Sequence, residues 1–327
     1  MINKIIILEY FISINPSLSD INDHTKKEGI KMTESFCNIL SKNCHESEIY
    51  ILKNYRINML PEKKIKFLIT QKKNDWIEII KKFDLKTKVI LIAPETDNIY
   101  IKIASIIQEL GLTLLNPNLK TIDLCCSKIK LVKTLEKLKI PHVKKFNERH
   151  SIKKKLILKP DRGTGSENIF ILRKRKELER IKKKIKFNYI LQKLYCGKKG
   201  SFSMVCNNGR NILLTCNKQL ILKKKKTIKQ IGLDNGRYEI YRRDFKYLAN
   251  LISENLKGLF GYVGVDVIKI KGEWRVLEIN ARLTSSIIDI DKTYNINVFD
   301  AISSIYLNKE LDWEKKVKLK KSKKVLF

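Results

Sequence analysis

The sequence lacks any apolar run approaching the roughly 20 residues that a bilayer-spanning helix needs. Its N-terminal apolar run, Ile5 to Leu8, is interrupted by Glu9, and no small-residue cleavage site follows, which argues against a signal peptide. We therefore expect a soluble, cytoplasmic protein with no membrane partner. The run itself is interpreted as a buried first strand.

Cysteines in CxxC pairs and histidines at the spacing of metal ligands are also missing. The seven cysteines form no CxxC pair, and their odd number does not suit a disulfide framework, so reduced thiols are expected. The four histidines, His24, His45, His142 and His150, show no zinc-ligand spacing. The sequence thus gives no support to a zinc site or a disulfide-stabilised fold.

Acidic residues are few, and the net charge of +34 raises the possibility of nucleic-acid binding. However, only 12 of the 68 basic residues are arginine, the residue that nucleic-acid surfaces favour. The basic run from Lys223 to Lys229 also contains no aromatic residue on which a base could stack. We interpret the lysines as solvated surface and keep a non-catalytic nucleic-acid-binding protein as the alternative from another class.

The 327 residues suffice for about two domains, and the first third alternates strands with helices. This alternation predicts a parallel sheet covered by helices on both faces. The predicted strands are 5–10, 65–70, 89–93 and 112–115, and the predicted helices are 27–40, 75–83 and 99–110.

After a predicted helix over 127–138, strands come in runs, which indicates an α+β unit with mostly antiparallel pairing. The expected strands are 156–158, 169–172, 189–194, 201–206, 211–215, 219–222, 262–270 and 274–279, with a helix over 241–256. The stretch from Lys223 to Gly236 is expected to be a mobile excursion. The lysine-rich tail over 313–327 is expected to be a peripheral strand or a frayed end.

Three oxygen-bearing side chains stand out on the last two predicted strands. Glu278 and Asn280 are two residues apart and therefore point to the same face, and a hairpin can bring Asp266 beside them. Two carboxylates and an amide oxygen suit Mg²⁺, which prefers hard oxygen ligands. The competing interpretation is that these residues pair with lysines on a solvated face, but polar groups within apolar strands are costly to bury without a partner.

A glycine-containing loop follows Lys159. Its residues Gly163, Thr164, Gly165 and Ser166 can expose backbone N–H groups to phosphate oxygens, while Lys159 supplies a positive charge from the end of the strand. The same residues could equally form a plain hairpin turn, so this loop alone does not decide between the two interpretations.

Taken together, these motifs resemble the ATP-grasp superfamily along most of the chain, to about Ser286. The resemblance implies ATP bound between two α+β lobes, behind an N-terminal α/β domain. The implied boundaries are 1–120 for the N-terminal domain, 121–195 for the first lobe, 196–312 for the second lobe with the metal, and 313–327 for the tail.

The resemblance also implies roles for individual residues. Phosphate contacts fall to Lys128 and Lys159, the flap to Arg162, Gly163, Thr164, Gly165 and Ser166, and the adenine hinge to Gln192, Lys193 and Leu194. Asp266, Glu278 and Asn280 match the magnesium ligands, and Arg282 matches the residue that contacts phosphate or the reacting carboxylate. Lys198 and Lys199 stand where the family often has an acidic residue for the ribose, and Ala281 stands where it often has proline.

The chemistry implied is ATP-dependent, ADP-forming ligation of a carboxylate to an amine, with Mg²⁺, or Mn²⁺ in its place, and no protein nucleophile. Catalytic roles fall to Arg282 and Lys159. More narrowly, the segments 7–10, 27–32, 217–219 and 279–286 resemble archaeal ligases that join tyramine to the γ-carboxylate of L-glutamate in methanofuran biosynthesis. A ligase for another amino acid or for a protein carboxylate is the alternative within the same chemistry.

Overall fold

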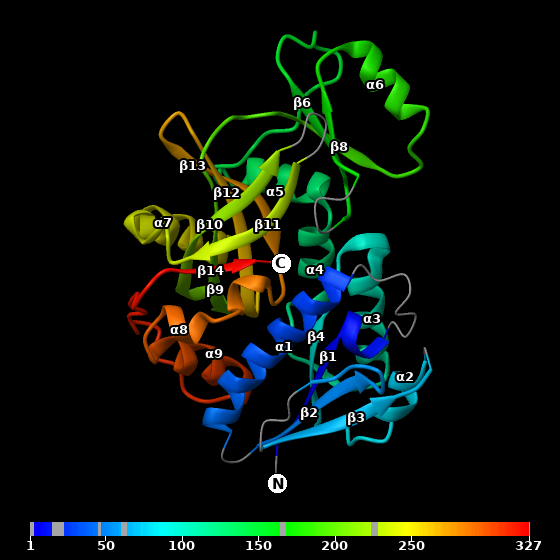
Figure 1. Cartoon of the computed structure of the whole chain (residues 1–327), viewed down its shortest axis with the longest axis vertical. Coiled ribbons are helices and arrows are strands. Elements are labelled where there is room, and N and C mark those ends of the chain that lie inside the picture. The colour runs from blue at the N-terminus through cyan, green and yellow to red at the C-terminus, as the bar shows by residue number, and fades with distance from the viewer. Residues whose placement is uncertain are drawn as a thin grey trace.

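The computed structural model describes residues 3–14, 23–44, 47–59, 64–72, 74–163, 168–223 and 228–326. Their strands form three sheets, which Figure 1 shows one above another, with the five-stranded N-terminal sheet at the bottom and the small lobe at the top. None of the described helices is both long and apolar enough to cross a membrane. All seven cysteines are free thiols.

The N-terminal sheet is parallel and has the strand order β3-β2-β1-β4-β5. Its strands are β1 (Asn3–Glu9), β2 (Ser47–Asn54), β3 (Ile65–Thr70), β4 (Lys88–Ile92) and β5 (Thr113–Leu114). Helix α1 (Asp23–Asn43) packs on one face, and α2 (Asp75–Ile80) and α3 (Ile99–Glu109) pack on the other. Because both faces are covered, β1 is apolar at consecutive positions: Ile5 and Ile7 join the α1 side, and Ile6 and Leu8 the other.

The small lobe is an antiparallel sheet of order β7-β6-β8. It contains β6 (Leu156–Pro160), β7 (Phe170–Leu172), β8 (Tyr189–Lys193) and helix α6 (Arg175–Lys182). Helices α4 (Leu119–Cys126) and α5 (Lys128–Lys137) lead from the N-terminal sheet to this lobe. The lobe has a small core of its own, centred on Leu156, Leu158 and Leu178.

The largest sheet is antiparallel and has the order β13-β12-β9-β10-β11-β14. Its strands are β9 (Lys199–Asn207), β10 (Arg210–Lys223), β11 (Ile228–Asn235), β12 (Gly261–Ile270), β13 (Glu273–Asn280) and β14 (Lys323–Leu326). Helix α7 (Arg242–Asn255) shares a core with one face, whereas α8 (Ile290–Thr293) and α9 (Asn297–Leu307) belong to the core that includes α1. The N-terminal domain and this sheet therefore have a continuous apolar core.

Short helical turns complete the described parts. They are a π-helix at Tyr10–Ile14 and 3-10 turns at Thr96–Asn98, Glu239–Tyr241 and Ser285–Ile287. The first two follow β1 and β4, where the parallel strands end near the large sheet (Figure 1).

The predicted fold class, a parallel α/β domain followed by antiparallel α+β lobes, is confirmed. The expected excursion over 223–236 is wrong for its second half, because 228–235 pair with β10 as β11; residues 224–227 lie outside the described residues. The strands predicted at 211–215 and 219–222 are one continuous strand, β10. The tail does end in a peripheral strand, since β14 pairs with β11 at the sheet edge.

Candidate active site

Lys128 is fixed in the first turn of α5 by an N-terminal cap. The Ser127 hydroxyl accepts a hydrogen bond from the Lys130 N–H at 3.2 Å and donates to the Asp161 carboxylate at 2.9 Å. Asp161 also accepts from the Ile129 N–H at 2.8 Å. Since side-chain oxygens satisfy the free N–H groups of a helix start, this cap ties α5 to the end of β6 and sets the position of Lys128.

The Lys128 ammonium contacts both the Glu278 carboxylate and the loop that follows Lys159. Its Nζ lies 3.0 Å from Glu278 Oε1 and donates to the Gly163 carbonyl at 3.1 Å. Burial lowers the pKa of Lys128, but the adjacent Glu278 carboxylate outweighs this effect and the net shift is upward. The side chain therefore stays charged beside Glu278.

Asp266 and Glu278 face each other across the β12–β13 hairpin. They are direct partners in the antiparallel register, and the register shifts between Asp266 and Val267, where Val276 follows as the next partner. The extra residue, Leu277, forms a β-bulge, and bulges turn side chains in new directions. As a result the consecutive residues Leu277 and Glu278 both line the cleft described below.

Asp266 experiences a strong electrostatic conflict. Burial, reinforced by the neighbouring Glu278, raises its pKa to about 7, although a hydrogen bond with Gln219 and the nearby cations Lys159 and Lys199 oppose the shift. A divalent cation would relieve this conflict, and two carboxylates are suitable hard donors. No group of three or more His, Cys, Asp or Glu suited to a metal occurs within the described ranges.

A cleft between the small lobe and the large sheet collects most of the predicted residues. The predicted residues that line this cleft are Lys128, Lys159, Gly163, Gln192, Lys193, Leu194, Asp266 and Glu278. Lys159 stands on β6, where burial lowers its pKa and the nearby Lys128 adds to the lowering, while the two carboxylates oppose it. The cleft is therefore lined by four lysines, Lys128, Lys159, Lys193 and Lys199, and by two carboxylates, Asp266 and Glu278, so that cations outnumber anions in its lining.

The predicted hinge forms the edge of this cleft. The Gln192 side chain is buried and donates from Nε2 to the Val143 carbonyl at 2.7 Å, and the Leu194 N–H donates to the Lys155 carbonyl at 2.8 Å. The chain here is thus held by bonds to its own lobe, which leaves the hinge segment a fixed surface for a planar ring. Val143, Ile157, Ile268 and Leu277 add apolar lining.

Two predicted basic residues do not line the cleft. Arg162 forms an ion pair with Asp123 of α4, and its Nη1 is buried without a hydrogen-bond partner in the described structure. Arg282 is paired with Glu95, as detailed below. Asn280 lies opposite Gly264, two residues beyond Glu278 on the same face of β13, but also outside the cleft lining. Thr164, Gly165 and Ser166 lie outside the described residues.

The sequence interpretation missed several cleft residues. They are Lys199, Gln219, Gln230, Tyr195 and the apolar residues Val143, Ile157, Pro160, Ile169, Ile221, Ile228, Ile268 and Leu277. The alternation of Gln219 and Ile221 on β10 is a readable signal, because both then face the same side of the sheet. Gln230 carried no such signal, since its strand was expected to be irregular.

Comparisons with known proteins agree with this geometry. A family model for an ATP-grasp domain matches residues 125–286, which include both lysines, the hinge and the carboxylates. This part of the chain, just under half of its 327 residues, is an ATP-grasp domain. A search of curated proteins found no match.

Among solved structures, the chain is similar to an ATP-grasp superfamily protein from Archaeoglobus fulgidus, with a TM-score of 0.72 and 20% identity over 95% of this chain and 89% of that one. It is also similar to N5-carboxyaminoimidazole synthetase from Staphylococcus aureus complexed with ADP, with a TM-score of 0.68 and 13% identity over 98% of this chain and 80% of that one. L-amino acid ligase from Bacillus licheniformis matches with a TM-score of 0.62 and 14% identity over 93% of this chain and 74% of that one. At these identities the likenesses establish the fold.

Proposed function

We propose that the protein uses ATP and Mg²⁺ to activate a carboxylate as an acyl phosphate and then joins it to an amine, releasing ADP and phosphate. The observation that supports this is the meeting of Lys128, Lys159, Asp266 and Glu278 in one cleft. A carboxylate is a poor electrophile, and transfer of the γ-phosphoryl group gives it a good leaving group. Attack by the amine then expels phosphate.

The chain's own residues would act chiefly through charge and position. Lys128 and Lys159 would contact phosphate oxygens, where two fixed cations stabilise the charge that gathers during transfer. Asp266, Glu278 and Asn280 would hold Mg²⁺, which supplies charge neutralisation on the phosphates when bound. Arg282 is proposed to contact the phosphoryl and acyl oxygens.

The ATP base is proposed to lie on the hinge. Gln192, Lys193 and Leu194 would provide backbone contacts, and Ile157 and Leu277 would provide apolar surfaces for the ring. The residues Arg162, Gly163, Thr164, Gly165 and Ser166 are proposed to cover the phosphates. Exclusion of water by such a cover would protect the acyl phosphate from hydrolysis.

For the substrates we propose L-glutamate, through its γ-carboxylate, and tyramine, as in methanofuran biosynthesis. The support is the resemblance of the segments 7–10, 27–32, 217–219 and 279–286 to ligases of that pathway. Two of these segments lie near each other, because Glu9 ends β1 and its carboxylate interacts electrostatically with Arg282 of the segment 279–286.

The test is an assay of ADP release by the purified protein with ATP, Mg²⁺, glutamate and tyramine. We expect release that requires both organic substrates. Release with a different amino acid or amine would replace this substrate pair within the same chemistry. Absence of turnover with every carboxylate–amine pair in a screen of amino acids, amines and peptides would reject the ligase proposal.

A further inference from the structure

The segment that follows the proposed metal strand is held by the N-terminal domain. The Tyr100 hydroxyl, on α3, donates to the Ala281 carbonyl at 2.8 Å and accepts from Asn116 Nδ2 at 2.8 Å. One residue later, Arg282 meets Glu95 from the loop after β4. Two consecutive residues beside the active site are therefore fixed by groups more than 180 residues earlier in the chain.

The contact between Arg282 and Glu95 fixes the whole plane of the guanidinium. Arg282 Nε and Nη2 lie 2.8 Å from the two Glu95 carboxylate oxygens, and Nη1 donates to the Leu283 carbonyl at 3.0 Å. Only about 10% of each side chain is exposed. A bidentate pair of this kind sets orientation as well as distance, which a lysine could not reproduce.

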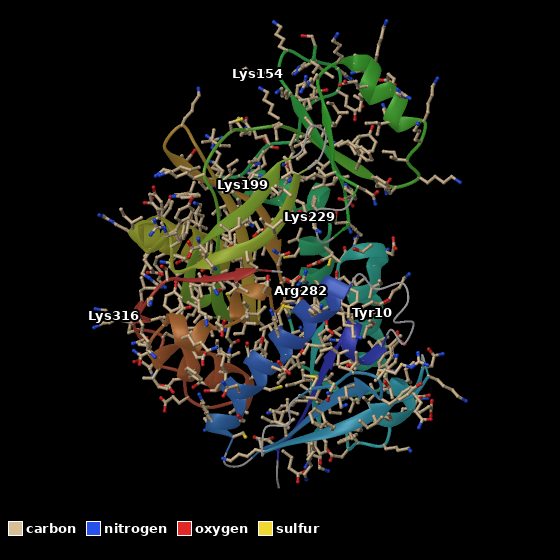
Figure 2. The ribbon with its side chains drawn as sticks, viewed as in Figure 1. Tyr10, Lys154, Lys199, Lys229, Arg282 and Lys316 are labelled. Atoms are coloured by element: carbon tan, nitrogen blue, oxygen red, sulfur yellow. The ribbon has the colours of Figure 1, made fainter. Side chains whose placement is uncertain are left out.

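The pair lies at the point of the N-terminal sheet where the direction of its strand connections reverses. In the order β3-β2-β1-β4-β5, the chain passes from β1 to β2 on one side and from β4 to β5 on the other, so the connections diverge between β1 and β4. Open parallel sheets bind ligands outside the carboxyl ends of strands at such a point. Glu95 follows β4 there, and Figure 2 shows Arg282 where the large sheet meets the N-terminal domain.

Stability alone gives a weak reason for the pair. Removing two charges from water costs several kcal/mol per ion, and apolar residues of similar volume often serve stability equally well or better. A planar, oriented guanidinium two residues after Asn280, the end of the proposed metal strand, is instead useful for recognising a planar carboxylate.

We propose that Glu95 is a positioning residue: it holds the Arg282 guanidinium in the orientation that the reacting carboxylate requires. This inference rests on the proposed function, which gives Arg282 its contact with the acyl and phosphoryl oxygens. The N-terminal domain thereby sets the geometry of the reaction.

The experiment compares Glu95→Gln, Glu95→Asp and wild-type protein for kcat, for the KM of each substrate and for Mg-ADP affinity by calorimetry. A displacement of the order of 1 Å at a reacting group can cost about 100-fold. We therefore expect Glu95→Gln to lose about 10- to 100-fold in kcat, with Mg-ADP affinity within about twofold of wild type. Glu95→Asp keeps the charge and should recover part of kcat.

A matched control is available in the pair Glu239–Arg242 at the start of α7, in which Arg242 Nε lies 2.6 Å from Glu239 Oε2 and Nη2 lies 3.0 Å from Oε1. Glu239→Gln should lower the melting temperature and leave kcat unchanged in the folded protein. Wild-type kcat in folded Glu95→Gln, or an equal loss in kcat and Mg-ADP affinity, would overturn the positioning role. Wild-type protein without turnover on any substrate pair would instead reject the proposed function.

Discussion

One ion pair lies inside the cleft and a second lies outside its lining, and the two differ in how firmly they are fixed. Lys128 meets Glu278 through one oxygen, and 28% of the Glu278 side chain is exposed. Arg282 meets Glu95 through two bonds of 2.8 Å, with 10% of each side chain exposed. The first pair can exchange partners when a charged ligand arrives, whereas the second holds a fixed orientation.

The difference between the two ion pairs indicates that the lobes and the N-terminal domain have different roles. The groups of the cleft, Lys128, Lys159, Asp266 and Glu278, come from the lobes and carry charges that a metal and phosphates would rearrange. The groups of the junction, Glu95 and Tyr100, come from the N-terminal domain and bind residues 281–282. Substitutions in the cleft should therefore remove nucleotide chemistry, and substitutions at the junction should disturb alignment.

The strongest way to test the cleft is Glu278→Gln, which keeps the size of the side chain and removes one of the two facing carboxylates. We expect ADP formation to fall by about 1,000-fold or more, because a proposed metal ligand and the partner of Lys128 are lost together. The rate is measured by coupled ADP release at saturating Mg²⁺. Glu273→Gln, on the same strand and half exposed, is the control and should keep the wild-type rate; equal rates in the two variants would contradict the metal assignment.

Lys159→Met should have the next largest effect. Burial disfavours the positive charge of Lys159, so an apolar residue in its place should not destabilise the fold. The substitution should, however, remove a charge that stabilises the phosphates. We expect kcat to drop by about 100-fold while the melting temperature changes little. Lys154→Met, an exposed position in the small lobe (Figure 2), is the control. A large loss of stability without loss of kcat would assign Lys159 to the fold.

Part of the cleft was predictable because those residues stand in short motifs on predicted strands. Lys159 ends an apolar strand, and the predicted hairpin can bring Asp266 beside Glu278, so their grouping follows from local geometry. The pairing of Arg282 with Glu95 was not predictable in this way. Glu95 follows a buried strand without any motif, and only the packing of the N-terminal sheet against the large sheet brings it to Arg282.

The fold shows the same contrast between local and long-range signals. The N-terminal strands and helices with strong apolar periodicity were found, but β2 (Ser47–Asn54) and α4 (Leu119–Cys126) were not. The strand β11 was mistaken for an irregular excursion because its sequence, with Lys229, Gln230 and Gly232, has little apolar alternation. Pairing with β10 on one side and β14 on the other stabilises it, and such partners are not visible locally.

The junction contains a second buried acid whose titration can be measured as stability. Burial raises the pKa of Glu9 to about 8, although the backbone N–H groups of Ile12 and Phe11 oppose the shift. Folding therefore favours the protonated acid, and this contribution is lost as the pH rises toward the folded-state pKa. Relative to Glu9→Gln, wild-type protein should lose about 2 kcal/mol of unfolding free energy between about pH 6 and pH 7.5.

Urea unfolding at several pH values measures this difference, with the glutamine variant serving as the control for all other titrating groups. The wild-type and Glu9→Gln curves should converge at low pH, where both side chains are neutral. Parallel curves throughout the range would show that Glu9 is ionised in the folded protein, and the junction would then carry one more negative charge beside Arg282 than we infer.

The smallest effect is expected from lysines outside both regions. Lys154, Lys229 and Lys316 are exposed and lie on different parts of the surface in Figure 2. Exposed charges interact weakly through water and salt, so the triple substitution to glutamine should leave kcat and the melting temperature within error of wild type. The same protein is assayed for duplex and single-stranded DNA at two salt concentrations. A salt-dependent affinity in wild type that the substitutions reduce, without any effect of Glu278→Gln on it, would show that the basic surface has a nucleic-acid partner of its own.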